Sequence, residues 1–217
     1  MKRKNFTLVE MLTVIAIISI LAGLVIPVVI IAQERGRVTQ AQSDITSLLT
    51  ALKQLDADYG KVLKKSNSNY AIGNQNATVS SDVAKIDGDV YDGMIAELSA
   101  PKNSALSSPS VNKRKRIYLE AKKGFDPTAN YTTDNNKKTL WRDPWGNPYM
   151  VYIKVTRDGE LELPGTNDKT IAGDFAIYSF GPNGEDDKGC NVSLDSCITA
   201  SDRDNHKLHD DIASWDM

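Results

Sequence analysis

The 217-residue sequence predicts an α+β fold, in which one long N-terminal helix packs against a small antiparallel β-sheet. Three observations predict it. Residues 11–32 form an uncharged apolar segment, an amphipathic segment follows to about residue 60, and strand-like segments bounded by turn residues dominate the last third. A helix followed by a run of strands is typical of α+β folds rather than of alternating α/β folds.

The composition excludes several functional classes. The chain has 41% hydrophobic and 25% charged residues and a net charge of −2, which disfavours a protein that binds nucleic acid through a basic face. Its two cysteines exclude a disulfide-dense miniprotein and a four-cysteine zinc site. The sequence contains no G-x-S-x-G, H-E-x-x-H or phosphate-loop motif. We therefore expect a protein that is not an enzyme.

The first predicted element is an apolar helix. Residues 11–32 carry no charge, and a helix of this length crosses the hydrocarbon core of a bilayer. Three basic residues at 2–4 precede the segment, which favours a cytoplasmic N-terminus and export of the rest of the chain. Arg35 and Arg37 follow it and weaken this asymmetry.

Composition alone leaves three interpretations of this segment open. It fits a secretory signal removed after Ala32, although the run exceeds the roughly 7–15 apolar residues typical of such signals. It also fits a plain signal anchor. The third interpretation starts from Glu10, because a carboxylate just inside an apolar helix is costly and marks a functional position. A cation at the same depth, such as an amine freed by cleavage upstream, would pair with it.

The helix is expected to continue as an amphipathic segment over 33–60. Gly60 then provides a stop signal. One helix from about Phe6 to about Tyr59 would be ~80 Å long. Pro27 lacks an N–H group and is expected to kink the helix or loosen it locally. Apolar residues at spacings of three and four form the stripe Val38, Ala41, Ile45, Leu48, Leu52, Leu55 and Tyr59.

Residues 61–140 carry weaker signals. The stretch 66–81 is polar and rich in turn residues, 91–98 predicts a short helix, and 116–120 predicts a strand. The basic run Asn112–Arg116 has two interpretations. It contacts an acidic partner or phosphate, or it is a solvated loop edge, which we favour.

The last third, residues 141–217, predicts the sheet. Asp143–Tyr149, with the sequence DPWGNPY, predicts a rigid turn and is followed by a strand over 150–155. Asp174–Phe180 predicts a second strand, which ends in the turn sequence Gly181–Gly184.

The first thirty residues carry a specific motif. A short basic leader, Phe6, Glu10 four residues later, a long apolar run and Pro27 together resemble the type III signal of type IV pilins and type II secretion pseudopilins. The resemblance implies that a prepilin peptidase cuts between Asn5 and Phe6 and methylates the new amine of Phe6. It also implies that Glu10 helps to pair that amine as subunits join a fibre. The family usually has glycine before the cut, where this chain has Asn5.

Two further motifs lie in the C-terminal third. DPWGNPY at 143–149 and YSFGPNGEDD at 178–187 resemble the globular domain of the major pseudopilin of type II secretion systems. The resemblance covers about 6–60 and 141–187 and is weak over 61–140. It implies a pilin-like fold with a C-terminal calcium-type loop. It also implies a structural subunit of a periplasmic pseudopilus that assembles by helix stacking and drives protein export.

The same resemblance implies a location and partners. The chain would cross the inner membrane once, with its N-terminus in the cytoplasm and its C-terminal domain in the periplasm, before it joins a homopolymeric fibre. Implied partners are the prepilin peptidase, the inner-membrane assembly platform and minor pseudopilins, with no nucleic acid. Two alternatives stay open: a type IV pilin or minor pseudopilin, and a membrane-anchored extracytoplasmic ligand-binding module.

The tail is acidic, since residues 185–217 hold nine Asp and Glu against three Lys and Arg. Carboxylates and turn carbonyls suit Ca²⁺, although from the residues alone a solvated acidic loop is the simpler interpretation. The family resemblance implies a calcium site here. Because 188–209 looks like an insertion in the calcium loop, Glu185–Asp187 are substitute ligands. The matching ligand positions are the Phe180 carbonyl, Asn183, Asp210 and Asp211.

Cys190 and Cys197 lie inside this insertion. Outside the cytoplasm we favour a disulfide that closes the loop, which would contribute ~2–3 kcal/mol to stability. Zinc bound together with His206 and His209 is an alternative, but the C-x6-C-x8-H-x2-H spacing fits no common zinc finger. Free thiols are the third possibility.

Overall fold

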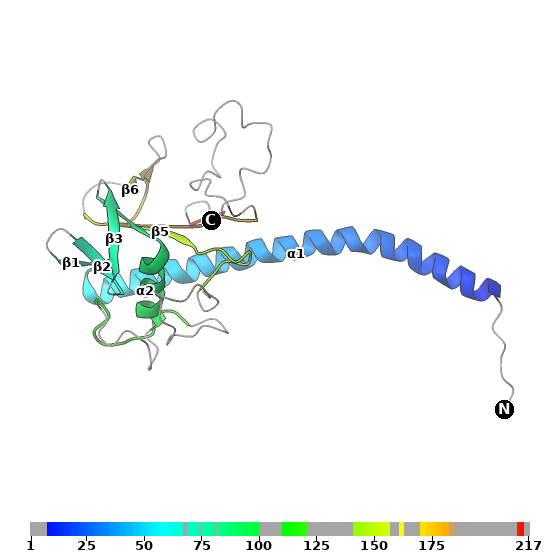
Figure 1. Cartoon of the computed structure of the whole chain (residues 1–217), viewed down its shortest axis with the longest axis horizontal. Coiled ribbons are helices and arrows are strands. Elements are labelled where there is room, and N and C mark those ends of the chain that lie inside the picture. The colour runs from blue at the N-terminus through cyan, green and yellow to red at the C-terminus, as the bar shows by residue number, and fades with distance from the viewer. Residues whose placement is uncertain are drawn as a thin grey trace, which may run out of the picture. The chain divides into compact units, whose positions relative to one another are not determined.

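The computed structural model describes residues 8–66, 69–73, 75–80, 82–99, 110–120, 141–156, 161–162, 170–182, 184 and 212–214. The chain divides into two compact units, Met1–Thr39 and Gln40–Met217, and each is considered separately. One helix, α1 (Leu8–Tyr59), belongs to both (Figure 1). It stays helical through Pro27 and Gly36.

In the second unit, α1 carries the predicted apolar stripe. The stripe residues from Ala41 to Leu55 are fully buried, whereas Lys53 and Gln54 on the other face are exposed. The helix ends at Tyr59, as expected. Gly60 has a φ of 66° and donates its N–H to the Asp56 carbonyl at 2.6 Å, which caps the last turn.

A seven-stranded antiparallel sheet packs against this part of α1, which confirms the predicted α+β class (Figure 1). Its strand order is β1-β2-β3-β4-β5-β8-β9, and β6 and β7 form a separate hairpin. The strands are β1 (Lys64–Ser66), β2 (Asn69–Ile72), β3 (Gln75–Ser80), β4 (Val83–Ile86), β5 (Met150–Lys154), β6 (Leu161–Glu162), β7 (Thr170–Ile171), β8 (Phe175–Ser179) and β9 (Ile212–Ala213). The strands predicted after the DPWGNPY turn and before the GPNG turn are β5 and β8.

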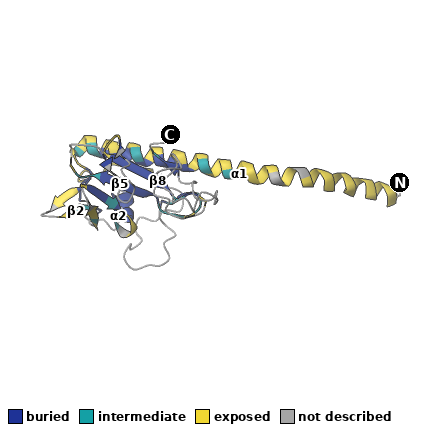
Figure 2. Cartoon of the chain, turned by 90° about the horizontal axis from the view of Figure 1, so that it is seen from above, coloured by how far each residue is buried: buried dark blue, intermediate teal, exposed yellow. Residues whose placement is uncertain are grey.

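Both faces of the central strands are buried (Figure 2). On one face the Tyr152 and Tyr178 rings stack with their centroids 6.3 Å apart, and the β6–β7 hairpin packs there through Leu161 and Ile171. Successive side chains of a strand point to opposite faces. The buried Val151, Ile153 and Ile177 therefore lie on the other face.

A second helix, α2 (Gly88–Ser99), confirms the short helix predicted over 91–98 and packs on β2, β3 and β4. Gly93 of α2 lies directly against Gly73, in the turn after β2. A Cβ atom added at Gly73 would lie 2.1 Å from the carbonyl carbon of Gly93, and Gly73 itself has a φ of 59°. Both positions require glycine, because no side chain fits between the two backbones.

Two expectations for residues 61–140 were wrong. The polar stretch 66–81, expected to form turns, contains β2, β3 and the end of β1. β1 is the edge strand, with β2 and β3 next to it, and few of the side chains described on β2 and β3 are fully buried, so their sequence has no apolar alternation to indicate a strand.

The strand predicted over 116–120 is absent from the described structure. The N–H groups of Tyr118 and Leu119 both donate to the Leu98 carbonyl at the end of α2, at 2.9 and 3.2 Å. Two donors that converge on one carbonyl hold the chain to a helix end and cannot start a strand ladder.

Candidate functional site

The first candidate site is the N-terminal part of α1. Among the side chains that the structure describes between Leu8 and Ile31, sixteen large apolar ones are exposed, from 43% at Val29 to 81% at Leu8 (Figure 2). A helix that is apolar on every side has to be covered by lipid or by other helices. Among the described residues, α1 is the one helix long and apolar enough to cross a membrane.

The polar side chains of this segment bond within the helix. The Thr13 hydroxyl donates to the Glu10 carbonyl at 3.0 Å, and the Ser19 hydroxyl donates to the Ile15 carbonyl at 2.7 Å. Hydroxyl donors satisfied in this way carry little cost in an apolar environment.

Glu10 is the one acidic or basic residue in the sequence between Leu8 and Gln33. Glu10 lies in the first turn of α1, where the partial positive charge of the helix N-terminus stabilises an anion. Phe6 and Asn5, the predicted cleavage and methylation positions, lie outside the described residues. The pairing of Glu10 with an amine at Phe6 therefore stays a prediction.

The second candidate site joins the two C-terminal motifs through Asp143. This buried carboxylate accepts the N–H groups of Trp145 (3.1 Å) and Asn147 (2.6 Å) through Oδ1, and the hydroxyl of Ser179 (2.7 Å) through Oδ2. The Ser179 hydroxyl in turn accepts the N–H of Gly181 at 3.1 Å. One carboxylate thus binds the DPWGNPY turn to the segment that follows β8.

Of the predicted calcium ligands, Phe180 is the one that lies among the described residues. This residue is half-buried, and its ring contacts Tyr178 edge-on at 6.0 Å. Asn183, Asp210 and Asp211 lie outside the described residues, as do Cys190 and Cys197. Within the described part of the chain, no group of three His, Cys, Asp or Glu residues is placed to hold a metal.

Sequence reasoning missed Asp44, a buried carboxylate on α1. Its Oδ2 accepts the Tyr149 hydroxyl at 2.8 Å and its Oδ1 accepts the Gln40 amide at 2.9 Å. Burial, followed by the charge of Asp44, raises the pKa of Tyr149 well above its usual range. Asp44 lies three residues after Ala41 and four before Leu48, so its place on the apolar stripe was a signal that it would be buried.

A second missed carboxylate, Glu97, organises the segment after α2. It accepts the N–H of Gly73 at 2.5 Å, the hydroxyl of Ser110 at 2.7 Å and the N–H of Asn112 at 2.7 Å, and it also accepts the N–H of Val111. Glu97 is 1% exposed and follows Met94 by three residues. This helical spacing was the available signal that it lies on the buried face of α2.

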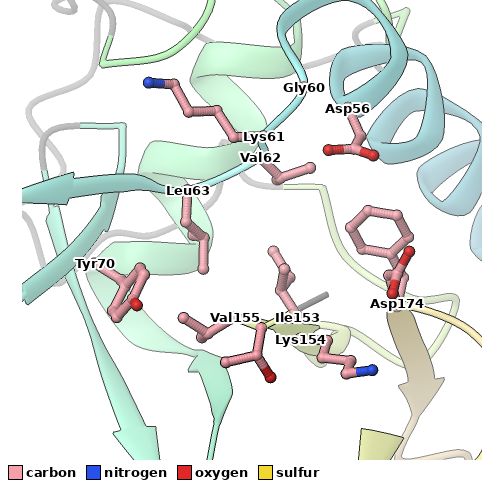
Figure 3. Close-up of a pocket in the computed structure, with 12 residues that line it drawn as sticks. Asp56, Gly60, Lys61, Val62, Leu63, Tyr70, Ile153, Lys154, Val155 and Asp174 are labelled. Atoms are coloured by element: carbon pink, nitrogen blue, oxygen red, sulfur yellow. The ribbon is translucent and has the colours of Figure 1, made fainter. Parts of the chain in front are cut away.

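A small cavity lies at the end of α1, between the loop that follows it and the facing ends of β5 and β8 (Figure 3). Leu63 and Ile153 point toward it, while the amino groups of Lys61 and Lys154 point away. Its volume is about 110 Å³. Pockets for small-molecule ligands usually measure roughly 300–1,000 Å³. This cavity is therefore smaller than a typical small-molecule pocket.

Comparison with known proteins finds one family match at the N-terminus and relatives over most of the chain. The family described as the Prokaryotic N-terminal methylation motif matches residues 2–26. Type II secretion system core protein G of Pseudomonas aeruginosa is 26% identical over 185 residues, covering 85% of this chain and 87% of the relative. Core protein G of Escherichia coli is 28% identical over 184 residues, covering 85% of each chain.

The chain carries a prepilin-type methylation motif and is similar to type II secretion system core protein G over most of its length. The relatives are named as core proteins of a secretion system, a structural role that agrees with the prediction of a protein that is not an enzyme. One apolar N-terminal helix, together with the similarity to core protein G, is consistent with a single-pass inner-membrane protein. No solved structure matches the chain significantly.

Proposed function

We propose that this protein is a pseudopilin, the structural subunit of a periplasmic pseudopilus that assembles by helix stacking and drives protein export by type II secretion. The observation that carries the proposal is the N-terminal part of α1. Its described residues expose sixteen large apolar side chains, most of them within the residues that match the methylation motif. Such a surface is stable in a bilayer and equally stable against copies of itself, so the same helix serves as anchor before assembly and as fibre core afterwards.

The proposed assembly step depends on Glu10. A prepilin peptidase would cut between Asn5 and Phe6, and the methylated amine of Phe6 would remain positively charged. In the apolar fibre core, a carboxylate without a partner is costly, so Glu10 of one subunit favours the position in which an amine lies against it. This ion pair would set the register of each added subunit, while the apolar side chains supply the contact area.

The proposal places the N-terminus in the cytoplasm and the C-terminal domain in the periplasm before assembly. The basic residues at 2–4 support this orientation. Proposed partners are the prepilin peptidase, the inner-membrane assembly platform and minor pseudopilins.

Intact-mass measurement of protein extracted from membranes tests the processing step. The mature chain is expected to begin at Phe6 with one methyl group. The cut removes three basic residues at 2–4, which lowers the count of Lys and Arg from 26 to 23, while the 28 Asp and Glu remain. A chain that begins at Met1 or at Gln33 contradicts the proposed processing.

Replacement of Glu10 tests the assembly step. Glu10→Ala is expected to reduce fibre yield at least tenfold, because the pairing that sets subunit register is lost, while the chain still enters the membrane. Glu34→Ala is the matched control, since Glu34 is also an acidic residue of α1 and its partner is Arg37 of the same helix, at 3.6 Å. Normal fibre yield from Glu10→Ala would show that apolar packing alone directs assembly.

We also propose that the C-terminal domain binds Ca²⁺ through the Phe180 carbonyl, Asn183, Asp210 and Asp211. The strand register supports this set. Ser179 of β8 lies opposite Ile212 of β9 in an antiparallel pair. Because the two chains run in opposite directions, continuing the register by one residue would bring position 211 opposite Phe180. Carboxylate and carbonyl oxygens are the ligands that Ca²⁺ prefers.

A further inference from the structure

The proposed function leaves one exposed isoleucine without a role. Ile117 is 65% exposed, and among the described residues outside α1 the one other exposed large hydrophobic side chain is Val79, at 38%. Ile117 directly follows the basic run. We call Lys113–Arg116 the basic loop, and all four of its side chains are exposed. An apolar side chain next to a cluster of cations is thus presented to solvent.

The backbone is held in place on both sides of Ile117. On one side, the side-chain oxygen of the buried Asn112 accepts the N–H of Arg116 at 3.0 Å. On the other side, the N–H of Tyr118 donates to the Leu98 carbonyl at 2.9 Å. Because the main chain is already fixed, Ile117 would lose little entropy on binding, which suits an anchor that fills a pocket of a partner.

The cavity at the end of α1 has room for one such side chain. Its volume is about 110 Å³. An apolar cavity of ~150 Å³ holds one benzene molecule, so in proportion this cavity takes roughly four carbons, the number in an isoleucine side chain. Thr156 and Asp174 also line the cavity and are exposed, so it reaches the surface. Its apolar lining consists of Val62, Leu63, Tyr70, Ile153, Val155 and Phe175.

The cavity carries the charge opposite to that of the basic loop. Asp56 of α1 and Asp174, directly before β8, both line it, and neither carboxylate forms an ion pair with another described residue. Figure 3 shows both carboxylates on one side of the cavity, whereas the amino groups of Lys61 and Lys154 point away from it. An isoleucine flanked by cations therefore matches an apolar cavity flanked by carboxylates, in size and in charge.

Ile117 and the cavity lie on different sides of α1, so they do not meet within one copy. Ile117 lines a shallow groove with Ala57 and Asp58, whereas the cavity is lined by Asp56. At about 3.6 residues per turn, Asp56 and Asp58 point in directions about 160° apart around the helix. The ion pair between Arg116 and Asp58, at 2.8 Å, holds the basic loop on its own side.

The geometry points to a contact between copies: Ile117 of one subunit enters the cavity of a second copy of this chain, where the basic loop lies against Asp56 and Asp174. This inference rests on the proposed fibre, in which copies are neighbours. Two different surfaces of one domain that bind each other give a heterologous contact, which repeats along an open assembly. The contact would link neighbouring C-terminal domains, while Glu10 would set the register of the helices.

Carbodiimide cross-linking of the full chain in its membranes tests the contact, because the reagent joins amines to carboxylates only where they touch. The expected product is a dimer in which a lysine of the basic loop is joined to Asp56 or Asp174, identified by mass spectrometry of the dimer band. Ile117→Ser keeps every reactive group and is expected to lower this dimer about tenfold. Val79→Ser removes the other exposed apolar side chain and, as the matched control, should leave the dimer unchanged.

A mixture of two variants separates loss of the contact from misfolding. Asp174→Lys places a cation at the cavity and is expected to lower the dimer about fivefold, because it repels the basic loop. The Ile117→Ser chain keeps an intact cavity, and the Asp174→Lys chain keeps an intact loop. Co-expression of the two is therefore expected to restore the dimer, with the loop of the Asp174→Lys chain joined to the cavity of the Ile117→Ser chain.

Several results would overturn the inference. They are a link found only in the monomer band, an unchanged dimer in Ile117→Ser, an equal loss in Val79→Ser, no restoration in the mixture, and a link from the basic loop to a different protein. Fibres that form without this link overturn the inference and leave the proposed function intact. The link without fibres overturns the proposed function alone.

Discussion

At the scale of single residues, three of the buried carboxylates in the described part of the chain join separate segments of the domain. Asp44, Glu97 and Asp143 each accept hydrogen bonds from groups distant in the sequence. A buried charge is tolerated only when hydrogen bonds surround it. Each carboxylate therefore fixes one junction. Asp44 joins α1 to the start of β5, and Asp143 joins the two C-terminal motifs. Glu97 joins α2 to the turn after β2 and to the segment that follows α2.

Removing Glu97 tests this account. Glu97→Ala leaves the N–H groups of Gly73, Val111 and Asn112 without their acceptor and is expected to lower the free energy of unfolding by about 3–5 kcal/mol. Urea unfolding of a fragment that lacks the first 32 residues measures the change. Glu120→Ala, at an exposed position, should change stability by less than ~0.5 kcal/mol. Equal effects of the two substitutions would contradict the role assigned to Glu97.

Asp58 gives a prediction about pH. The hydroxyl of Tyr118, which donates to Asp58 at 2.6 Å, and the guanidinium of Arg116 hold the pKa of Asp58 below its usual 3.8. The stabilisation from this lowered pKa is complete above pH 3.8 and is lost as the pH falls through the pKa of the folded state. Carboxyl NMR titration should show the pKa of Asp58 rising toward 3.8 in Tyr118→Phe. Tyr70→Phe should leave it unchanged, and a rise there as well would point to a global effect.

At the scale of elements, the sequence predicts those whose apolar pattern matches their burial. For this reason the sequence predicts the stripe on α1, the short helix α2 and the strands β5 and β8. The strands β2 and β3 could not be predicted, because few of the side chains described on them are buried. The segment at 116–120 has the composition of a strand, but its N–H groups bond to the end of α2, and a local pattern cannot reveal a partner that distant.

The contact between α2 and the turn after β2 gives a prediction for Gly93. Alanine usually stabilises a helix interior by ~1 kcal/mol relative to glycine. At Gly93, however, the added Cβ would lie 2.9 Å from the Gly73 carbonyl oxygen, so Gly93→Ala is expected to destabilise the domain by about 1–3 kcal/mol. Gly36→Ala, with no atom within 4 Å of the added Cβ, should be neutral or stabilising. Thermal unfolding that ranks the two variants in the opposite order would contradict this packing.

At the scale of the whole molecule, the chain combines a helix that needs an apolar environment with a domain that has its own core. The sequence predicts this division because the apolar residues of α1 first cover every side of the helix and then form a single stripe. Such a change can be recognised from neighbouring residues alone. It predicts the candidate site only in part. The link from Asp143 to Ser179 spans 36 residues and depends on the pairing of β5 with β8, which no spacing in the sequence encodes.

Calcium is expected to stabilise the C-terminal domain. In a fragment that lacks the first 32 residues, a cation bound only by the folded state adds ~2.7 kcal/mol at a hundred times its Kd. The melting temperature should therefore rise with Ca²⁺ and fall with chelator, and Mg²⁺ should substitute poorly because it holds its waters in a tighter shell.

Variants identify the ligands. Asp210→Ala combined with Asp211→Ala should abolish the calcium response, while Glu185→Ala should keep it. A full response in the double variant would assign the site to the Glu185–Asp187 cluster instead.

The exposed side chains of α1 also restrict the route by which a subunit can travel. Placing sixteen large apolar side chains in water would cost on the order of tens of kcal/mol, at ~1.5–3 kcal/mol each. In the proposed role, a subunit therefore has no free aqueous stage and passes directly from lipid into the growing end. The bilayer then acts as the reservoir of subunits, and fibre growth depends on their density in the membrane plane rather than on their concentration in the periplasm.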